Sequence, residues 1–319
     1  MPVVIEGNYQ KPERVVTGLY SFDHALSNKR TGDIGYPTKS IIEVYGSQGV
    51  GKSTLTYFLA GRRSTGGRIL ICDLEGLDPD YLPVAVGTTG FDGTIEIIDS
   101  VEPKGKKRTH EEMINELTDR TLYEEEINVG ILDSVGAILP VFENESEIGE
   151  GFGAKRAVIV AQFSRKATYT VNNKETQPNL FVVNHSHMAV GGGYGHHSAG
   201  GVALSHLGVV RLFLRYSTKD FIKSADDILA YVVEGTVEKL RYGGKGRKFK
   251  VAYVPGWGVR PNLTAMIDCV DLGIADRKAT VKIGDQSFGY ISKMVEEDLS
   301  GNDDFFAPFH EALKNYKEE

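Results

Sequence analysis

One eight-residue motif restricts the fold of this chain more than any other feature. Residues 46–53 read Gly-Ser-Gln-Gly-Val-Gly-Lys-Ser and match the phosphate-binding pattern G-x-x-x-x-G-K-S at each specified position. The motif lies between an apolar strand pattern, residues 41–45, and a helix pattern, residues 53–60. Its glycines let successive backbone N–H groups turn toward one anion at a helix N-terminus. The motif therefore predicts a nucleotide-phosphate site, the alternative being a Gly-rich turn with a chance Lys-Ser pair.

Two side chains of this loop have expected roles in binding a nucleotide and Mg²⁺. Lys52 is expected to reach the β- and γ-phosphates, and the Ser53 hydroxyl is expected to bind Mg²⁺. The candidate nucleotide-binding residues of the loop are Gly46, Ser47, Gln48, Gly49, Val50, Gly51, Lys52, Ser53 and Thr54.

A phosphate site of this kind needs a second metal anchor, usually an Asp that ends an apolar strand. Asp133 follows the apolar residues 129–132, and Asp73 follows the similar residues 69–72, so the pattern alone leaves both open. Glu75 lies just beyond Asp73 and is a candidate for activating water. The alternative for Glu75 is a helix-capping or solvated carboxylate.

Strand and helix patterns alternate along the chain, which predicts a doubly wound, mainly parallel sheet with an antiparallel extension. The expected strands are residues 41–45, 69–73, 95–98, 129–133, 180–184, 209–214, 231–237 and 249–254. The expected helices are residues 53–60, 111–128, 154–167 and 305–316, and short strands are expected within 274–289. The Gly-rich run 191–201 is expected to be a mobile loop. These patterns divide the chain into a short arm (1–16), a core (17–260) and a small C-terminal α+β region (261–319).

Charge and composition narrow the classes of function. The 319 residues include 36 Lys and Arg against 43 Asp and Glu, a net charge of −7, so nucleic acid binding must depend on local patches. Two cysteines cannot form a disulfide framework or a four-cysteine zinc site. No apolar run approaches the length of a membrane span, so we expect a cytoplasmic protein without a membrane partner.

Three further segments occur in an order that is typical of one family. Residues 17–26 read Thr-Gly-Leu-Tyr-Ser-Phe-Asp-His-Ala-Leu, residues 73–79 read Asp-Leu-Glu-Gly-Leu-Asp-Pro, and residues 132–140 read Leu-Asp-Ser-Val-Gly-Ala-Ile-Leu-Pro. Together with the phosphate loop, they resemble the RecA family of ATP-dependent recombinases, including its phage branch. The resemblance covers roughly residues 17–260 and implies a RecA-like P-loop ATPase core.

The resemblance implies roles for individual residues around ATP and Mg²⁺. It makes Asp133, rather than Asp73, the metal anchor and Glu75 the catalytic glutamate. His185 stands at the position of a γ-phosphate sensor that couples nucleotide state to the following loop. The other implied residues are Asp78 and Tyr81 at the adenine ring and Lys239 and Arg241, which would contact ATP held by a neighbouring protomer.

DNA binding is expected in two loops, one that begins at residues 147–150 and one at residues 186–201. Tyr194 stands where the family has an aromatic wedge between bases, and Phe152 is either exposed to DNA or an anchor of the following helix. Adjacent histidines 196 and 197 could donate to phosphate, or bind a metal only with a third ligand. The alternative for the second loop is a disordered surface segment. The candidate DNA-binding residues are Phe152, Arg165, Met188, Gly191, Gly192, Gly193, Tyr194, His196 and His197.

A basic run forms a third candidate surface. Residues 239–250 contain six Lys and Arg and no Asp or Glu, and the Gly243-Gly244 turn predicts a hairpin. This hairpin is expected to project cations toward a neighbour's phosphates or toward duplex DNA.

The resemblance implies a DNA-dependent ATPase that binds single-stranded DNA as a filament and promotes homologous pairing and strand exchange. Expected partners are single-stranded DNA, then duplex DNA, further copies of the chain, and loader or single-strand-binding proteins, in a bacterial host cytoplasm if the chain is phage-encoded. One alternative is a non-filamenting RecA paralogue that acts as a recombination mediator, which the short segment before Thr17 favours. A hexameric helicase is the other.

Overall fold

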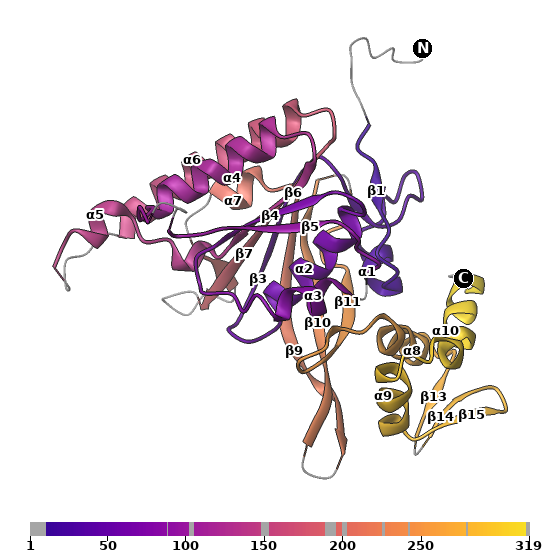
Figure 1. Cartoon of the computed structure of the whole chain (residues 1–319). Helices are drawn as coiled ribbons and strands as arrows, with labels where there is room; N and C mark the ends of the chain where they lie inside the picture. The colour runs from indigo at the N-terminus through magenta and orange to yellow at the C-terminus, as the bar shows by residue number, and fades with distance from the viewer. Residues whose placement is uncertain are drawn as a thin grey trace, which may run out of the picture.

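The computed structural model of this protein describes residues 11–87, 89–101, 105–147, 153–188, 196–199, 203–224, 227–241, 243–278 and 280–316. A ten-stranded sheet forms the centre, with helices on both faces and a smaller region at one end (Figure 1). The strands are β1 (Arg14–Val15), β2 (Tyr36–Pro37), β3 (Ser40–Gly46), β4 (Arg68–Asp73), β5 (Thr94–Ile98), β6 (Ile127–Asp133), β7 (Asn179–Met188), β8 (His196–Ser198), β9 (Val210–Ser224), β10 (Asp227–Leu240), β11 (Lys248–Val254), β12 (Gly258–Val259), β13 (Asp276–Arg277), β14 (Val281–Ile283) and β15 (Gln286–Gly289). The helices are α1 (Tyr20–Ala25), α2 (Lys52–Arg63), α3 (Tyr81–Gly87), α4 (His110–Tyr123), α5 (Val141–Asn144), α6 (Gly153–Asn173), α7 (Ala203–Leu207), α8 (Pro261–Asp271), α9 (Ile291–Leu299) and α10 (Asp303–Asn315), with a 3-10 turn at η1 (Val135–Ala137).

The central sheet has the strand order β12-β11-β10-β9-β3-β7-β6-β4-β5, and β8 pairs with β7. The strands from β9 to β5 in this order are parallel, whereas β10, β11 and β12 continue the sheet in antiparallel pairs. This arrangement confirms the predicted α/β fold with a mainly parallel sheet and an antiparallel extension. Each of the eight predicted strands overlaps an observed one, in the same chain order.

Alternate residues of the parallel strands fill two separate apolar cores, because successive side chains point to opposite faces of a sheet. On β3, Ile42 and Val44 pack with α1, α2 and α3, whereas Ile41 packs with α4, α6 and α7. On β4, Ile71 belongs to the first core and Leu70 to the second. The near-continuous apolar runs of these strands therefore reflect burial on both sides.

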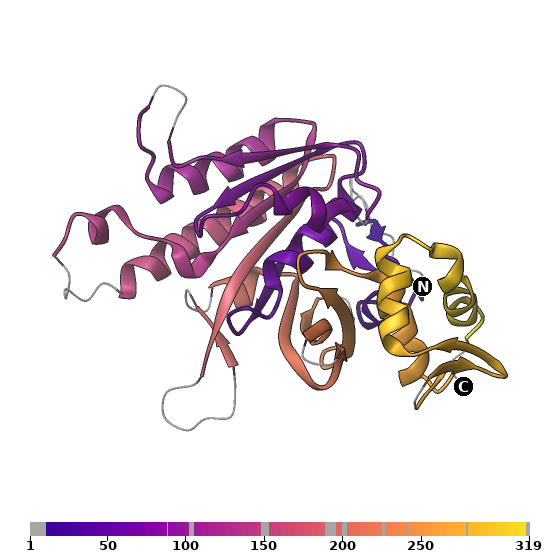
Figure 2. The same cartoon turned by 60° about the horizontal axis from the view of Figure 1, so that its bottom comes forward.

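The C-terminal region packs on the antiparallel end of the sheet. Ala230 and Val232 of β10 and Ala252 of β11 share a core with α8, α9 and α10. In both views this region lies at the opposite end of the molecule from α5 (Figures 1 and 2). Because this core includes strands from before residue 260, the division into residues 17–260 and 261–319 stays a prediction.

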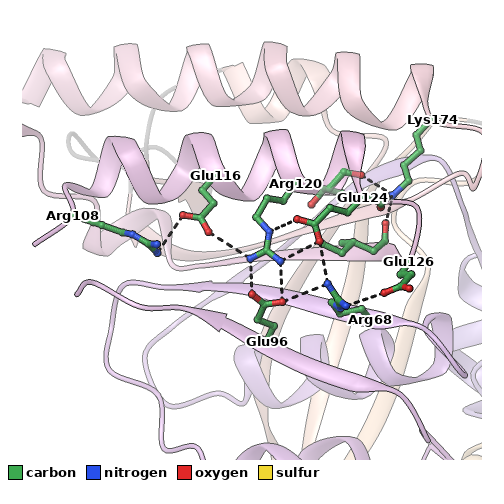
Figure 3. A network of polar contacts seen from close by, with 10 residues as sticks. Arg68, Glu96, Arg108, Glu116, Arg120, Glu124, Glu126 and Lys174 are labelled. Carbon is green, nitrogen blue, oxygen red and sulfur yellow. Dashed lines mark hydrogen bonds and ion pairs between the residues drawn. The ribbon is translucent and has the colours of Figure 1, made fainter. Parts of the chain in front are cut away.

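Arginine side chains tie the edge strand β5 to helix α4 (Figure 3). Arg120 donates to both oxygens of Glu96, at 2.6 and 2.9 Å, and to both oxygens of Glu124, at 2.5 and 3.1 Å. Arg68 of β4 donates to Glu124 at 3.0 Å and to Glu126 at 2.8 Å. Since each guanidinium serves carboxylates from more than one element, the network holds the edge of the sheet against α4.

Several predicted boundaries are wrong. The helix expected over residues 111–128 ends at Tyr123, and β6 already begins at Ile127. The run 191–201, expected to be a loop throughout, contains the short strand β8. Strand β9 continues to Ser224, well past residue 214, because it pairs with β10 in a long hairpin. Among the described residues, no helix is both long and apolar enough to cross a membrane.

Asp268→Asn tests the contact between α8 and α1. Asp268 is 2% exposed and accepts a hydrogen bond from the Ser21 backbone N–H at 3.0 Å. Burial raises the pKa of Asp268 to about 7, although the hydrogen bonds from Ser21 act in the opposite direction. The ordinary pKa of about 3.9 is lower, so protonation stabilises the folded state at low pH and this stabilisation is lost as the pH rises to about 7. Between about pH 3.9 and pH 7 the wild type therefore loses stability that the variant does not lose. In urea titrations we expect the free energy of unfolding of the variant minus that of wild type to increase by about 1.4 kcal/mol per pH unit over this range. Asp276→Asn, at an exposed carboxylate of the same C-terminal region, is the control, and a pH-independent difference for Asp268→Asn would contradict the prediction.

Candidate functional site

The candidate site lies at the carboxyl edge of the parallel strands, where β3 and β6 end on either side of β7. β3 ends at Gly46, which opens the phosphate loop, and Gly46 is in register with His185 of β7. β6 pairs with the other side of β7 and ends at Asp133. In open α/β sheets, ligands bind at this edge, so the topology brings the predicted loop, metal anchor and sensor together.

The phosphate loop enters helix α2 through Gly51, whose φ of 84° lies in the left-handed region that favours glycine. Tyr253 of β11 packs against Gly51, because a Cβ there would lie 3.0 Å from the tyrosine ring. The Tyr216 hydroxyl donates to the Gly49 carbonyl at 2.6 Å. Side chains of β9 and β11 thus contact the phosphate loop.

Lys52 begins helix α2 and is 6% exposed. Its ammonium donates to the Ser47 carbonyl at 2.8 Å, across the mouth of the phosphate loop. Burial lowers the pKa of Lys52, while the nearby carboxylates of Glu75 and Asp133 oppose this shift. The loop therefore holds one buried cation between two carboxylates.

Asp133 is 3% exposed and has one oxygen available for a ligand. Oδ2 accepts the Tyr57 hydroxyl at 2.7 Å, whereas Oδ1 is buried and has no hydrogen-bond partner among the described residues. Burial raises the pKa of Asp133, and the Tyr57 and Ser53 hydroxyls oppose this shift. A buried carboxylate oxygen without a donor beside a serine hydroxyl fits a divalent cation.

Asp73, the other candidate for the metal anchor, accepts hydrogen bonds from the backbone of the loop that follows it. Its two oxygens accept the N–H groups of Glu75, Gly76 and Leu77 at 3.0, 3.2 and 2.6 Å. These bonds fix the turn that carries Glu75 past the end of β4. No cluster of three or more His, Cys, Asp or Glu that could hold a metal occurs in the described part of the chain.

Glu75 lies just beyond β4 and contacts the residue that follows β6 as well as His185 within β7. Its Oε1 accepts a hydrogen bond from the Ser134 hydroxyl and lies 2.9 Å from Nε2 of His185. Burial opposes ionisation of Glu75, but the hydrogen bonds from Ser134 and His185 and the charge of Lys52 outweigh it and hold the pKa of Glu75 below its ordinary value. Glu75 therefore carries a negative charge near neutral pH.

Close packing fixes the imidazole of His185. A Cβ on Gly136 would collide with the His185 ring, so glycine is required for the ring to lie against η1. The backbone N–H of His185 donates to the Asn184 side chain at 2.8 Å. The ring is thus held at the position from which it reaches Glu75.

The two residues expected at the adenine ring lie beside α2. The Tyr81 hydroxyl is 3.1 Å from the Thr54 hydroxyl, next to the phosphate loop. Asp78 is exposed, and its Oδ1 accepts the Asp80 N–H at 3.0 Å. Gln48 and Ser47 are exposed at the loop, and Val50 is fully buried beneath it.

The basic run 239–250 forms the predicted turn between β10 and β11, and some of its cations bind backbone carbonyls of neighbouring helices. Lys239 donates to the Ser205 and His206 carbonyls at the end of α7, both at 2.7 Å. Arg247 donates to the carbonyls of His24 and Ser27 at the end of α1. These two cations bind the C-termini of helices, whereas Lys245 and Lys248 are exposed at the turn, so a hairpin that projects cations stays a prediction. Within the same run, Lys250 pairs with Asp271 at 2.8 Å, and Arg241 is exposed.

The candidate DNA-binding residues fall mostly outside the described structure. Those outside the described residues are Phe152, Gly191, Gly192, Gly193 and Tyr194. Met188 ends β7, and His196 and His197 belong to β8, but their side chains lie outside the described part. Arg165 is exposed on α6, where it lines a small cavity shared with α4.

Two residues that the sequence analysis did not assign support the site. Ser134 donates to Glu75, and Tyr57 donates to Asp133. The sequence carried a signal for Tyr57, because it lies four residues after Ser53 and therefore on the same face of α2. Ser134 directly follows the metal-anchor candidate, but only the fold shows that it meets Glu75.

Comparisons with known proteins agree with this architecture. A family model described as the RecA N-terminal domain matches residues 4–257. The chain is similar to protein RecA of Caulobacter vibrioides (strain NA1000 / CB15N), 29% identical over 308 residues that cover 95% of this chain and 81% of that protein. It is also similar to protein RecA of Desulforapulum autotrophicum, 27% identical over 277 residues (82% and 71%). Protein RecA of Gloeobacter violaceus is 29% identical over 271 residues (83% and 68%).

Tyr57→Phe tests the hydrogen bond that holds Asp133. Loss of the hydroxyl donor leaves the buried carboxylate less stabilised, so its pKa rises further and more of it is protonated at low pH. We expect the Mg²⁺ concentration for half-maximal binding of a fluorescent ATP analogue to rise about tenfold at pH 6, and by less at pH 8. Tyr36→Phe is the matched control, because the buried Tyr36 hydroxyl donates to the Leu59 carbonyl, also at 2.7 Å. Equal shifts in both variants would contradict a specific role for Tyr57.

Proposed function

The chain belongs to the RecA family, and from this premise we propose that it is a DNA-dependent ATPase that assembles on single-stranded DNA and promotes homologous pairing and strand exchange. The observation that carries the proposal is the hydrogen bond between Glu75 and His185, at 2.9 Å. It links the candidate water-activating carboxylate to the strand that leads into the Gly-rich segment. A change at Glu75 during ATP hydrolysis would therefore reach the proposed DNA-binding segment through His185.

The phosphate loop and its neighbours would bind ATP and Mg²⁺. Backbone N–H groups of residues 46–53 and the Lys52 ammonium would hold the phosphates, and Ser53 and Asp133 would hold Mg²⁺. Mg²⁺ would neutralise charge on the phosphate oxygens. The free, buried Oδ1 of Asp133 supports this assignment. Tyr81 and Asp78, beside α2, would contact the base.

Glu75 would orient and activate the attacking water. Its lowered pKa keeps it ionised near neutral pH, which a general base requires. Ser134 and His185 hold the carboxylate from two sides, so it loses little freedom when water is positioned. When phosphate contacts draw His185 away, the same bond would break, and this would report nucleotide state to β7.

Arg241 and Lys239 would complete the site of a neighbouring protomer by stabilising charge on its γ-phosphate. Arg241 is exposed and therefore accessible to another copy. Lys239 would have to leave the carbonyls at the end of α7, or act by holding α7 in place. The DNA strand would contact the Gly-rich segment, with Tyr194 stacking on bases and Met188, His196 and His197 nearby. Phe152 and Arg165 would belong to the first DNA-binding loop.

Glu75→Gln tests the assignment of the general base. The amide keeps the size of the side chain but cannot accept a proton from water, so we expect ATP affinity to change little and steady-state ATP turnover with single-stranded DNA to fall at least about a hundredfold. Glu126→Gln, which removes an exposed carboxylate from the network at Arg68, is the control and should keep its turnover. Turnover of Glu75→Gln near that of wild type would remove Glu75 from this role.

Electron microscopy tests the function as a whole. With single-stranded DNA and a slowly hydrolysed ATP analogue, we expect regular helical filaments, because the cations proposed for the neighbour's ATP act only between adjacent protomers. Without nucleotide, filaments should be short or absent. Closed rings would instead support a helicase, and small particles would support a recombination mediator.

A further inference from the structure

A fully buried carboxylate lies in the middle of the sheet, on the strand that carries the phosphate loop. Glu43 of β3 is 0% exposed and lies three residues before Gly46. Its Oε2 accepts the Nε–H of Arg211 in β9 at 2.5 Å, and its Oε1 accepts the Asn184 amide of β7 at 2.9 Å. Because β3 lies between β7 and β9, one carboxylate binds the strands on both sides of it.

The same side chains reach both ends of the Gly-rich segment. Arg211 also donates through Nη2 to the Ser198 hydroxyl of β8, at 3.1 Å. Asn184 also donates to the Ala199 carbonyl at 2.9 Å, and the Ala199 N–H donates to the His185 carbonyl at 3.0 Å. The chain that leaves the sheet through β7 and the chain that returns through β8 are therefore bound to one cluster, which we define as Glu43, Arg211, Asn184 and Ser198.

Stability alone does not require this cluster. Desolvation of a buried ion pair often outweighs the attraction between its charges, and well-packed apolar residues of similar volume are frequently as stable. The charged side chains instead fix the relative positions of the strands, because each oxygen of Glu43 accepts a hydrogen bond from a different strand. The Arg211 guanidinium also lies 4.8 Å from the ring centre of Tyr45, the residue directly before Gly46. Movement of the phosphate loop relative to β7 or β9 would break one of these bonds.

We propose that the cluster of Glu43, Arg211, Asn184 and Ser198 is a positioning device that couples the phosphate loop to both ends of the Gly-rich segment. Nucleotide binding at the loop and DNA binding at the segment then strengthen each other. The inference rests on the proposed function, because it concerns ATP and single-stranded DNA bound to the same chain. None of the four side chains touches the reacting atoms in this role. They act through His185 and through the register of β8 against β7.

Glu43→Gln tests the coupling. The measured quantity is the ratio of the dissociation constants for a fluorescent single-stranded oligonucleotide without nucleotide and with a slowly hydrolysed ATP analogue. The variant keeps a side chain of the same size but loses the charge that holds Arg211, so we expect this ratio to fall at least about tenfold. Linkage requires an equal fall in the effect of DNA on the affinity for the ATP analogue, which provides a second measurement of the same coupling.

The chain offers a matched control in a second buried ion pair. Arg260, which directly precedes α8, donates to Asp298 of α9 at 2.6 Å, and the two side chains are 12% and 1% exposed, compared with 16% and 0% for Arg211 and Glu43. Asp298→Asn therefore removes a similar buried charge far from the loops in sequence and should leave the ratio unchanged. If Glu43→Gln does not fold, Ser198→Ala decides, because it removes only the Arg211 bond to the returning strand and should lower the ratio about threefold.

The outcomes separate this inference from the proposed function. Wild-type protein whose DNA affinity does not depend on nucleotide would overturn both. A wild-type protein with strong coupling, together with an unchanged ratio in folded Glu43→Gln, would overturn the positioning role alone. An equal fall in Asp298→Asn would also overturn it, because the effect would then be one of stability.

Discussion

The order of the strands in the sheet decides where the candidate site residues lie. β3 pairs with β7 and β9, and β6 pairs with the far side of β7, so the parallel strands end at one edge. The phosphate loop, Asp133 and His185 are far apart in the sequence, yet the loop follows β3, Asp133 ends β6, and His185 lies in β7 beside Gly46. A shift of one strand in register would remove its side chain from the site, because successive residues of a strand face opposite sides. The buried bonds of Glu43 to both neighbours of β3 hold that register where it matters most.

The two carboxylates at this edge have been given opposite environments. Asp133 is buried, one of its oxygens has no donor among the residues that the structure describes, and burial raises its pKa. Glu75 is partly exposed and held by Ser134 and His185, and its pKa is lowered. A carboxylate that is costly to keep charged gains most from a cation, whereas one that is already ionised can take a proton from water. The difference in environment therefore matches the difference in the roles proposed for them.

The sequence predicted the strands and the phosphate loop well, because both are specified locally. Eight apolar runs mark the strands of the central sheet, and the spacing of glycines, Lys52 and Ser53 needs no tertiary information. The contact between Ser134 and Glu75 could not be predicted from residue spacing, since it joins the ends of different strands. β8 was missed because three polar residues carry no apolar alternation, and its pairing depends on β7. Lys239 and Arg247 seemed free for a partner because their acceptors are backbone carbonyls at helix ends, which leave no trace in the sequence.

The distribution of charge determines what kind of DNA contact this chain can make. Residues 261–319 contain 12 Asp and Glu but only six Lys and Arg, so most of the net negative charge lies in the C-terminal region. In the core, Lys239, Arg247 and Lys250 are engaged by carbonyls or by a carboxylate. Cations engaged in this way would contribute little to counterion release, so these three would add little to binding of a phosphate backbone. On the proposed function, affinity then comes from repetition of short contacts along the strand, each oriented by β7 and β8. Such contacts add up only when neighbouring protomers are aligned, so DNA binding would be coupled to assembly. A nucleotide that controls the Gly-rich segment would therefore control both DNA binding and assembly.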